Sequence, residues 1–234
     1  MYRRLLTPFA IMQGLWLLRR APTLPAPAGT SGRCGLGLGA PLKVIGVGDS
    51  IMVGTGVREQ RHSLTATFAH LLHDSLARDV DWCVHGCNGA TSANVRDRIA
   101  PTAEAADAYV VSCGVNDATR GVPPSRFAQN LADILQVLRR KAPRAIVLYA
   151  GLPPVATFPA LSWPLNVILA ERVDSLRLAA AAVIARDERA YAFEFPASMP
   201  ADAFASDGFH PAETACERWA RGLLELWPRT AQPD

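Results

Sequence analysis

The sequence lacks the features that mark several classes of protein. Only 19% of its 234 residues are charged and half are hydrophobic, which fits neither a disordered chain nor a coiled coil. Its five cysteines are few and odd in number, which argues against a disulfide framework, and 17 glycines are too few for collagen. A globular chain of this length forms one domain, or one domain with an appendage.

Acidic residues are absent from the first 48 positions, which contain six basic residues. From Asp49 onward 18 basic residues stand against 21 acidic ones, so the globular part is slightly acidic although the whole chain carries +3. No basic face is therefore expected, and nucleic acid is excluded as a partner.

The longest N-terminal apolar segment is too short to cross a membrane. It runs from Pro8 to Arg20 after a plausible helix start at Thr7, and a helix of 13 residues reaches only about 20 Å. The hydrocarbon core of a bilayer is about 30 Å thick. Residues 1–20 are therefore predicted to form an apolar, basic helix that does not span.

Three interpretations of this N-terminal helix stay open. A secretory signal is suggested by Arg3, Arg4 and the small residues of 26–28, but the prolines and the arginines after the apolar run argue against it. Residues 5–20 suit an interfacial helix on anionic lipid, and a helix docked on its own domain is the third interpretation. Localisation is accordingly cytoplasmic or peripherally membrane-associated, with export as the alternative.

Composition places the domain boundaries. Residues 21–41 contain four prolines and five glycines, which predicts a linker. The folded domain is expected over residues 42–228, followed by a short tail at 229–234.

Short apolar runs alternate with longer helical patterns along this domain. Such an alternation predicts a five-stranded parallel sheet covered by helices on both faces. The expected strands are Lys43 to Val47, Asp81 to His85, Ala108 to Ser112, Ala145 to Tyr149 and Ala190 to Phe195. The expected helices are Ser63 to Arg78, Ser92 to Ile99, Ser125 to Arg140, Leu165 to Arg189 and Pro211 to Trp227. Chemistry in such folds lies beyond the carboxyl ends of the strands.

A glycine-rich turn with Ser50 at its corner follows the first expected strand. Glycines allow the sharp turn that raises a serine above a sheet, which is a nucleophile's position. A plain turn and a phosphate loop are the alternatives, although the Walker lysine is missing and the glycines do not form GxGxxG.

Three later segments carry further candidate groups. Gly89 leads into a helix and can offer a backbone N–H to a developing negative charge, and Asn116 can offer a side-chain amide. Turn and capping roles are the alternatives for both. Asp207 precedes His210 by three residues, close enough to fix the imidazole tautomer and leave Nε2 free as a base.

Together these segments resemble the GDSL esterase and lipase group, the SGNH hydrolase superfamily. The resemblance rests on Gly48-Asp49-Ser50, on Gly89 in Asn-Gly-Ala-Thr, on Gly114-Val115-Asn116-Asp117 and on Asp207-Gly208-Phe209-His210-Pro211, in that order. It spans roughly residues 43–227. Ile51 and Val115 depart mildly from the family pattern and remove no reacting group.

This resemblance implies a three-layer α/β/α, flavodoxin-like fold and hydrolysis of carboxylic acyl esters through an acyl-enzyme. Ser50 is the implied nucleophile, His210 its base and Asp207 the residue that orients the imidazole. The implied oxyanion hole combines the N–H groups of Ser50 and Gly89 with the Asn116 amide. The scheme requires neither a metal nor a cofactor.

The apolar stretch 151–164 emerges at the expected active-site edge. It is predicted to line an acyl pocket through Phe158 and Trp163, with Phe209 beside the catalytic histidine. The alternative is a stiff connection whose aromatic residues cover the core. Acyl chain length and the alcohol moiety are not specified by this pattern.

Cys83, His85 and Cys87 alternate along one expected strand and raise the idea of a metal site, but a structural zinc ion needs four ligands. An acyltransferase or a carbohydrate deacetylase can use the same constellation as an esterase. A catalytically silent flavodoxin-like binding module is the alternative from another class, and a flavin protein fits least.

Overall fold

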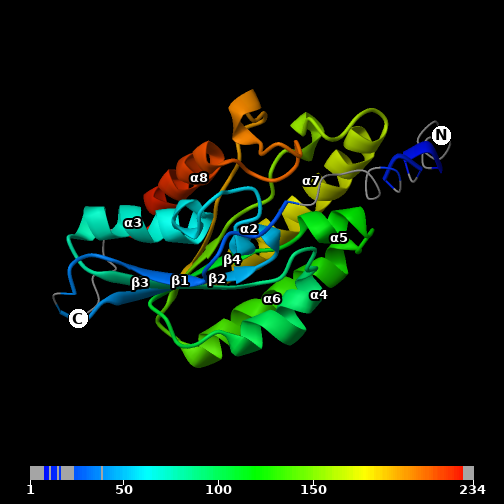
Figure 1. Cartoon of the computed structure of the whole chain (residues 1–234). Coiled ribbons are helices and arrows are strands. Elements are labelled where there is room, and N and C mark those ends of the chain that lie inside the picture. Colours follow the sequence, from blue (N-terminus) through cyan, green and yellow to red (C-terminus); the bar gives the residue numbers. More distant parts are fainter. Residues whose placement is uncertain (1–7, 11, 15, 17–23, 38, 229–234) are drawn as a thin grey trace.

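The computed structural model describes residues 8–10, 12–14, 16, 24–37 and 39–228. These residues form a mixed α/β fold around one sheet with the strand order β1-β3-β2-β4-β5-β6 (Figure 1). The strands are β1 (Ser31–Cys34), β2 (Leu42–Gly48), β3 (Val80–Gly86), β4 (Ala108–Ser112), β5 (Ile146–Tyr149) and β6 (Ala190–Ala192). Strands β2 to β6 pair in parallel, which confirms the predicted architecture.

Strand β1 is a correction to the predicted count of five strands. It lies within residues 21–41, where composition indicated a linker, and pairs antiparallel with β3 at the sheet edge. Its exposed, glycine-containing sequence carries no apolar alternation, so pattern analysis could not find it. Backbone pairing and an ion pair between Arg33 and Asp81 hold it in place. A Cβ on Gly32 would lie 2.6 Å from the Trp82 ring, so only glycine fits there.

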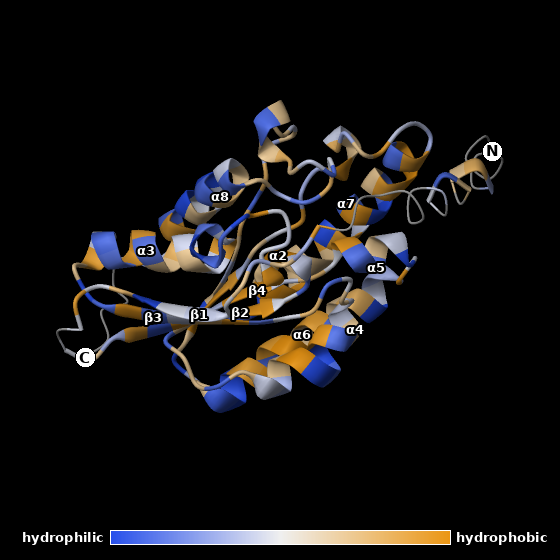
Figure 2. Cartoon of the chain, viewed as in Figure 1, coloured by the Kyte–Doolittle hydropathy of each residue, from blue (hydrophilic) through white to orange (hydrophobic). Residues whose placement is uncertain are grey.

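Helices cover both faces of the sheet, as the crossover rule predicts. Helices α3 (Leu64–Leu76) and α8 (Glu213–Glu225) lie on one face, and α6 (Pro124–Lys141) lies on the other with α7 (Leu165–Ile184) packed beside it (Figure 1). Each face has its own apolar core, one around Phe68 and Trp219 and the other around Phe127 and Leu131. Figure 2 shows the apolar residues concentrated in the strands and on the inner sides of the helices.

The shorter elements and some boundaries differ from the expectations. The structure adds α2 (Ser50–Val53), α5 (Val115–Thr119) and 3-10 turns at Gln60–His62, Ala100–Thr102, Val155–Thr157 and Ala201–Ala203, and α4 spans Ser92–Asn94. The helix predicted over Ser92 to Ile99 is α4 followed by a π-helical turn, Val95–Ile99. Helix α7 ends at Ile184 instead of Arg189, and β6 ends at Ala192 instead of Phe195.

Residues 8–10, 12–14 and 16 are helical and are referred to below as the N-terminal helix. This helix contacts the domain, since Ala10 is only 4% exposed. Among the described residues, no helix combines the length and hydropathy that a membrane span requires. The remaining predicted helix positions, part of the linker and the tail at 229–234 lie outside the described residues.

The register of the sheet brings the ends of three strands to one level. Gly48 at the end of β2 pairs with Gly86 of β3 on one side and with Ser112 of β4 on the other. A Cβ on Gly48 would lie 2.1 Å from the Ser112 carbonyl oxygen, so this close approach requires glycine. The loops that follow these strands therefore open into the same space.

Candidate active site

Asp49 shapes the turn that presents Ser50. Its side chain caps α2 by accepting a hydrogen bond from the Ile51 N–H at 3.1 Å, and it accepts a second from the Ser112 hydroxyl at 2.9 Å. The side chain is buried, and burial raises the pKa of the Asp49 carboxyl against the lowering effect of these hydrogen bonds. The turn is thus fixed from within α2 and from the neighbouring strand β4, with Ser50 as the first residue of α2.

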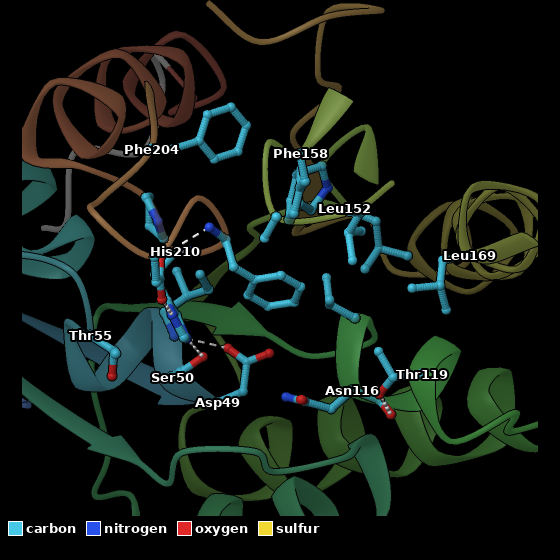
Figure 3. A pocket seen from close by; sticks show the side chains of 18 of the residues that line it. Asp49, Ser50, Thr55, Asn116, Thr119, Leu152, Phe158, Leu169, Phe204 and His210 are labelled. Carbon is cyan, nitrogen blue, oxygen red and sulfur yellow. Dashed lines mark hydrogen bonds and ion pairs between the residues drawn. The ribbon is translucent and has the colours of Figure 1, made fainter. Parts of the chain in front are cut away.

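Ser50, His210 and Asp207 form a continuous chain of hydrogen-bonding contacts. The Ser50 Oγ lies 3.1 Å from His210 Nε2, and His210 Nδ1 lies 2.5 Å from an Asp207 carboxylate oxygen. Figure 3 shows the imidazole directly beside the serine hydroxyl. With the proton on Nδ1, Nε2 offers its lone pair to the serine, which is the arrangement of a nucleophile, a base and an orienting acid.

The Asp207 carboxylate is held by more than the histidine ring. Its second oxygen accepts hydrogen bonds from the N–H groups of Phe209 and His210, both at 2.9 Å. Burial alone raises the pKa of Asp207, but the hydrogen bonds from the imidazole and from these two N–H groups bring it below its ordinary value. The carboxylate is therefore ionised at neutral pH and faces Nδ1 as an acceptor.

Gly89 and Asn116 follow the two strands that flank β2 and line the same cavity as Ser50 and His210. Gly89 has a left-handed backbone with φ of +73°, which favours glycine in this turn. The Asn116 amide donates one hydrogen bond to the Ala90 carbonyl at 3.0 Å. An amide carries two donor hydrogens, so Asn116 retains another for a bound group. The five residues predicted for the chemistry thus meet at one place.

A buried polar network that sequence reasoning missed supports this region. Asp117 accepts hydrogen bonds from the backbone N–H of Ser92 at 2.8 Å and from the Ser92 hydroxyl at 2.5 Å. The Asn130 amide donates to the same hydroxyl, and Arg96 donates to Asn130. Burial raises the pKa of Asp117 despite these hydrogen bonds. The sequence signal that could have pointed to Asp117 was its position directly after Asn116.

An apolar cavity of about 680 Å³ opens beside Ser50 and His210. Phe158 and Phe209 both line it and contact each other edge to face, with 5.3 Å between ring centroids. Phe158 also belongs to the apolar core, as the alternative interpretation of this residue expects. Trp163 is 64% exposed and lies outside the cavity wall, which corrects its predicted place. The chain turns its ring outward, and its backbone carbonyl instead accepts a hydrogen bond from Gln13.

In the described structure, Cys83, His85 and Cys87 do not form a metal site. Cys83 Sγ and His85 Nε2 are 3.9 Å apart, while Cys87 is exposed, and all five cysteines are free thiols. Within the described part of the chain, no group of three or more potential ligands is arranged to hold a metal ion.

Comparison with known families assigns the chain. The model of the GDSL-like Lipase/Acylhydrolase family matches residues 47–217, which includes every residue of the hydrogen-bonded chain. The chain belongs to this GDSL family. It is therefore a carboxylic ester hydrolase.

Solved structures of similar fold agree with this GDSL assignment. The lipase Lip_vut3 from a goat rumen metagenome has 15% identity and a TM-score of 0.64, covering 79% of this chain and 96% of that one. TesA has 25% identity and a TM-score of 0.58, covering 78% and 96%. A family two carbohydrate esterase from Clostridium thermocellum, solved with cellohexaose, has 15% identity and a TM-score of 0.58, covering 82% and 65%. No curated protein matches this GDSL hydrolase.

Proposed function

We propose that this GDSL hydrolase cleaves esters of apolar acyl chains through an acyl-enzyme on Ser50. The observation that carries the proposal is the Ser50–His210–Asp207 contact chain at the edge of an apolar cavity. Phe158, Leu152 and Leu169 line this cavity, and such a wall suits a hydrocarbon chain (Figure 3).

In the first step His210 Nε2 accepts the proton of the Ser50 hydroxyl while Oγ bonds to the ester carbonyl carbon. The tetrahedral intermediate then collapses, the bond to the alcohol oxygen breaks, and the imidazolium returns the proton to the leaving alcohol. Water repeats the sequence on the acyl-enzyme with His210 again as base, releasing the acid and restoring Ser50. Asp207 keeps the imidazole oriented and stabilises its charged form.

The negative charge on the carbonyl oxygen needs donors during both steps. We assign this role to the N–H groups of Ser50 and Gly89 and to the remaining amide hydrogen of Asn116. In other oxyanion holes, losing one donor costs about 3 to 4 kcal/mol of transition-state stabilisation.

Two further candidates use the same site. An alcohol in place of water would make the enzyme an acyltransferase, and a small acetyl ester of a sugar would make it a deacetylase. The structural similarity to a carbohydrate esterase supports the deacetylase as a candidate. The apolar cavity favours longer acyl groups than acetyl. Product analysis with added alcohols and with acetylated sugars separates the three.

We also propose peripheral contact with a lipid surface through the N-terminal helix. Phe9, Met12 and Trp16 are 59%, 63% and 58% exposed in the described structure. The flanking sequence contributes four arginines and no acid within residues 1–20, which suits anionic lipid.

The test of the esterase proposal compares wild type and Ser50→Ala on p-nitrophenyl acetate and butyrate. Wild type should hydrolyse both esters and should be labelled by a fluorophosphonate probe, and Ser50→Ala should do neither. Full activity in Ser50→Ala contradicts the assignment of the nucleophile. A wild type that is neither active nor labelled supports a silent binding module instead.

A further inference from the structure

The N-terminal segment forms part of the cavity wall. Ala10, Gly14 and Leu24 line the same cavity as Ser50 and His210. All three precede residue 47, where the family match begins. This portion of the wall is therefore supplied by a segment outside the region that the family model covers.

Gln13 fastens this segment to the start of α7. The residue before α7 is Pro164, which offers no side-chain cap, and the Leu165 N–H at the helix start instead donates to Gln13 Oε1 at 3.2 Å. Gln13 Nε2 donates in turn to the Trp163 carbonyl at 2.8 Å. These contacts join positions about 150 residues apart in sequence and hold the helix in one place.

The N-terminal helix is held at the end of the cavity away from Ser50. Leu165, Ile168 and Leu169 of α7 line the cavity, and Figure 3 shows Leu169 on the opposite side from Ser50. In Figure 1 the N-terminal helix lies beyond α7, well separated from α2 at the centre of the molecule.

The N-terminal helix turns its small residues toward the cavity and its large apolar residues toward solvent. A helix that docked only to bury apolar surface would have the opposite orientation. Ala10 and Gly14, four residues apart and hence on one face, line the cavity, whereas Phe9 and Met12 are more than half exposed. Burying large apolar side chains is what stabilises packing, so a helix docked only for stability would turn them inward. Small residues facing inward instead leave the space beside them empty.

We propose that the N-terminal helix forms the distal wall of the acyl cavity and sets the longest acyl chain that the enzyme accepts. The inference rests on the proposed esterase function and names medium- and long-chain acyl esters as the substrate class. The decisive position is Gly14, because a Cβ there would meet no atom within 4 Å. A larger side chain can therefore occupy the end of the cavity without displacing its neighbours.

The experiment compares Gly14→Phe with Met12→Phe, which adds the same ring to the same helix at a side chain that is 63% exposed. The readout is kcat/KM for p-nitrophenyl acetate, butyrate, octanoate, laurate and palmitate, each below its aggregation concentration. We expect Gly14→Phe to lower the values for laurate and palmitate by about tenfold or more and to leave acetate and butyrate within about twofold. Met12→Phe should keep the wild-type profile. An unchanged chain-length profile in Gly14→Phe overturns the proposal.

A second measurement separates this proposal from the proposed function. In the Ser50→Ala background, saturated fatty acids of increasing length displace a fluorescent apolar probe, and this readout needs no hydrolysis. Gly14→Phe should weaken laurate and palmitate binding and spare octanoate, whereas equal binding of all lengths in both proteins contradicts the wall. Gln13→Ala keeps the cavity residues but removes the hydrogen bonds that hold the helix, so it should bind acids longer than the longest that wild type binds, and the proposal stays testable if Gly14→Phe unfolds. Wild type that binds acids but hydrolyses no ester contradicts the proposed function alone.

Discussion

The Oγ atom of Ser50 lies 3.1 Å from the Nε2 atom of His210, across 160 residues of sequence. Ser50 begins the helix after β2, and His210 stands in the loop before α8, so strands β3 to β6 separate the two segments in the chain. In the proposed mechanism this contact carries the proton transfer from Ser50 to His210, and the first predictions concern His210 and Asp207.

Removing the base should cost more than removing the residue that orients it. His210→Ala leaves Ser50 without a proton acceptor, whereas Asp207→Ala leaves an imidazole that still accepts a proton from a less fixed position. By the behaviour of other triads we expect losses in kcat on the order of a million-fold and ten-thousand-fold respectively. Steady-state kinetics on p-nitrophenyl butyrate measures both. An Asp207→Ala variant that loses more than His210→Ala would contradict the assigned roles.

Asn116→Ala should lower kcat by about 100- to 1,000-fold, because it removes a donor to the oxyanion. The hydrogen bond to the Ala90 carbonyl is also lost, so the melting temperature is recorded alongside the kinetics. Asn166→Ala is the matched control, because this half-buried asparagine on α7 also donates its amide to a backbone carbonyl, that of Ala156, and it should retain wild-type kcat. A kcat in Asn116→Ala equal to that of the control removes Asn116 from the oxyanion hole.

The strand–helix order and the residues that meet at the candidate site were predictable from sequence because both depend on local pattern. Apolar runs mark the strands, and glycine turns after them mark the places where Ser50 and Gly89 emerge. The features that were not predicted have no local sequence pattern. β1 has no alternation of apolar and polar residues, and Gln13 meets α7 only through contacts across the folded chain.

Trp163 shows the same limit at the level of one side chain. Its position in an apolar loop at the active-site edge was predicted from sequence, but the outward turn of its ring depends on how the loop packs. The hydrogen bonds between Ser92 and Asp117 were missed for a related reason, since the two residues follow different strands.

Asp49→Asn should stabilise the fold at neutral and mildly alkaline pH. Both hydrogen bonds to Asp49 end on a single oxygen, which an asparagine side chain can also present, and the substitution removes a buried charge. Because burial raises the pKa of Asp49 in the folded state, wild type gains stability from this group as pH falls and loses it as pH rises through the folded pKa. The melting temperature of Asp49→Asn should therefore exceed that of wild type near pH 8, and the two should converge near pH 4. A difference that is constant across this range contradicts the burial argument.

Asp117→Asn should destabilise the protein, in contrast to Asp49→Asn. Asp117 uses one oxygen for the Ser92 N–H and the other for the Ser92 hydroxyl, and an amide can replace only one of these acceptors. The expected loss is about 1 to 3 kcal/mol in the free energy of unfolding, measured by urea denaturation. Asp74→Asn, with a side chain 59% exposed on α3, should change stability little. Equal stability in the two variants would show that the network contributes nothing to the fold.

Exposed apolar residues of the N-terminal helix should govern binding to lipid. The double variant Phe9→Gln/Met12→Gln removes two side chains that are 59% and 63% exposed, and it should sediment less than wild type with vesicles of phosphatidylcholine and phosphatidylglycerol. Leu178→Gln, an equally large apolar residue that is 75% exposed but lies far along α7, serves as the control and should sediment like wild type. Raising the salt concentration should weaken the binding of all three proteins, because the arginines of residues 1–20 attract the anionic lipid. If the double variant and Leu178→Gln sediment alike, the N-terminal helix is only a docked wall of the cavity and makes no contact with the membrane.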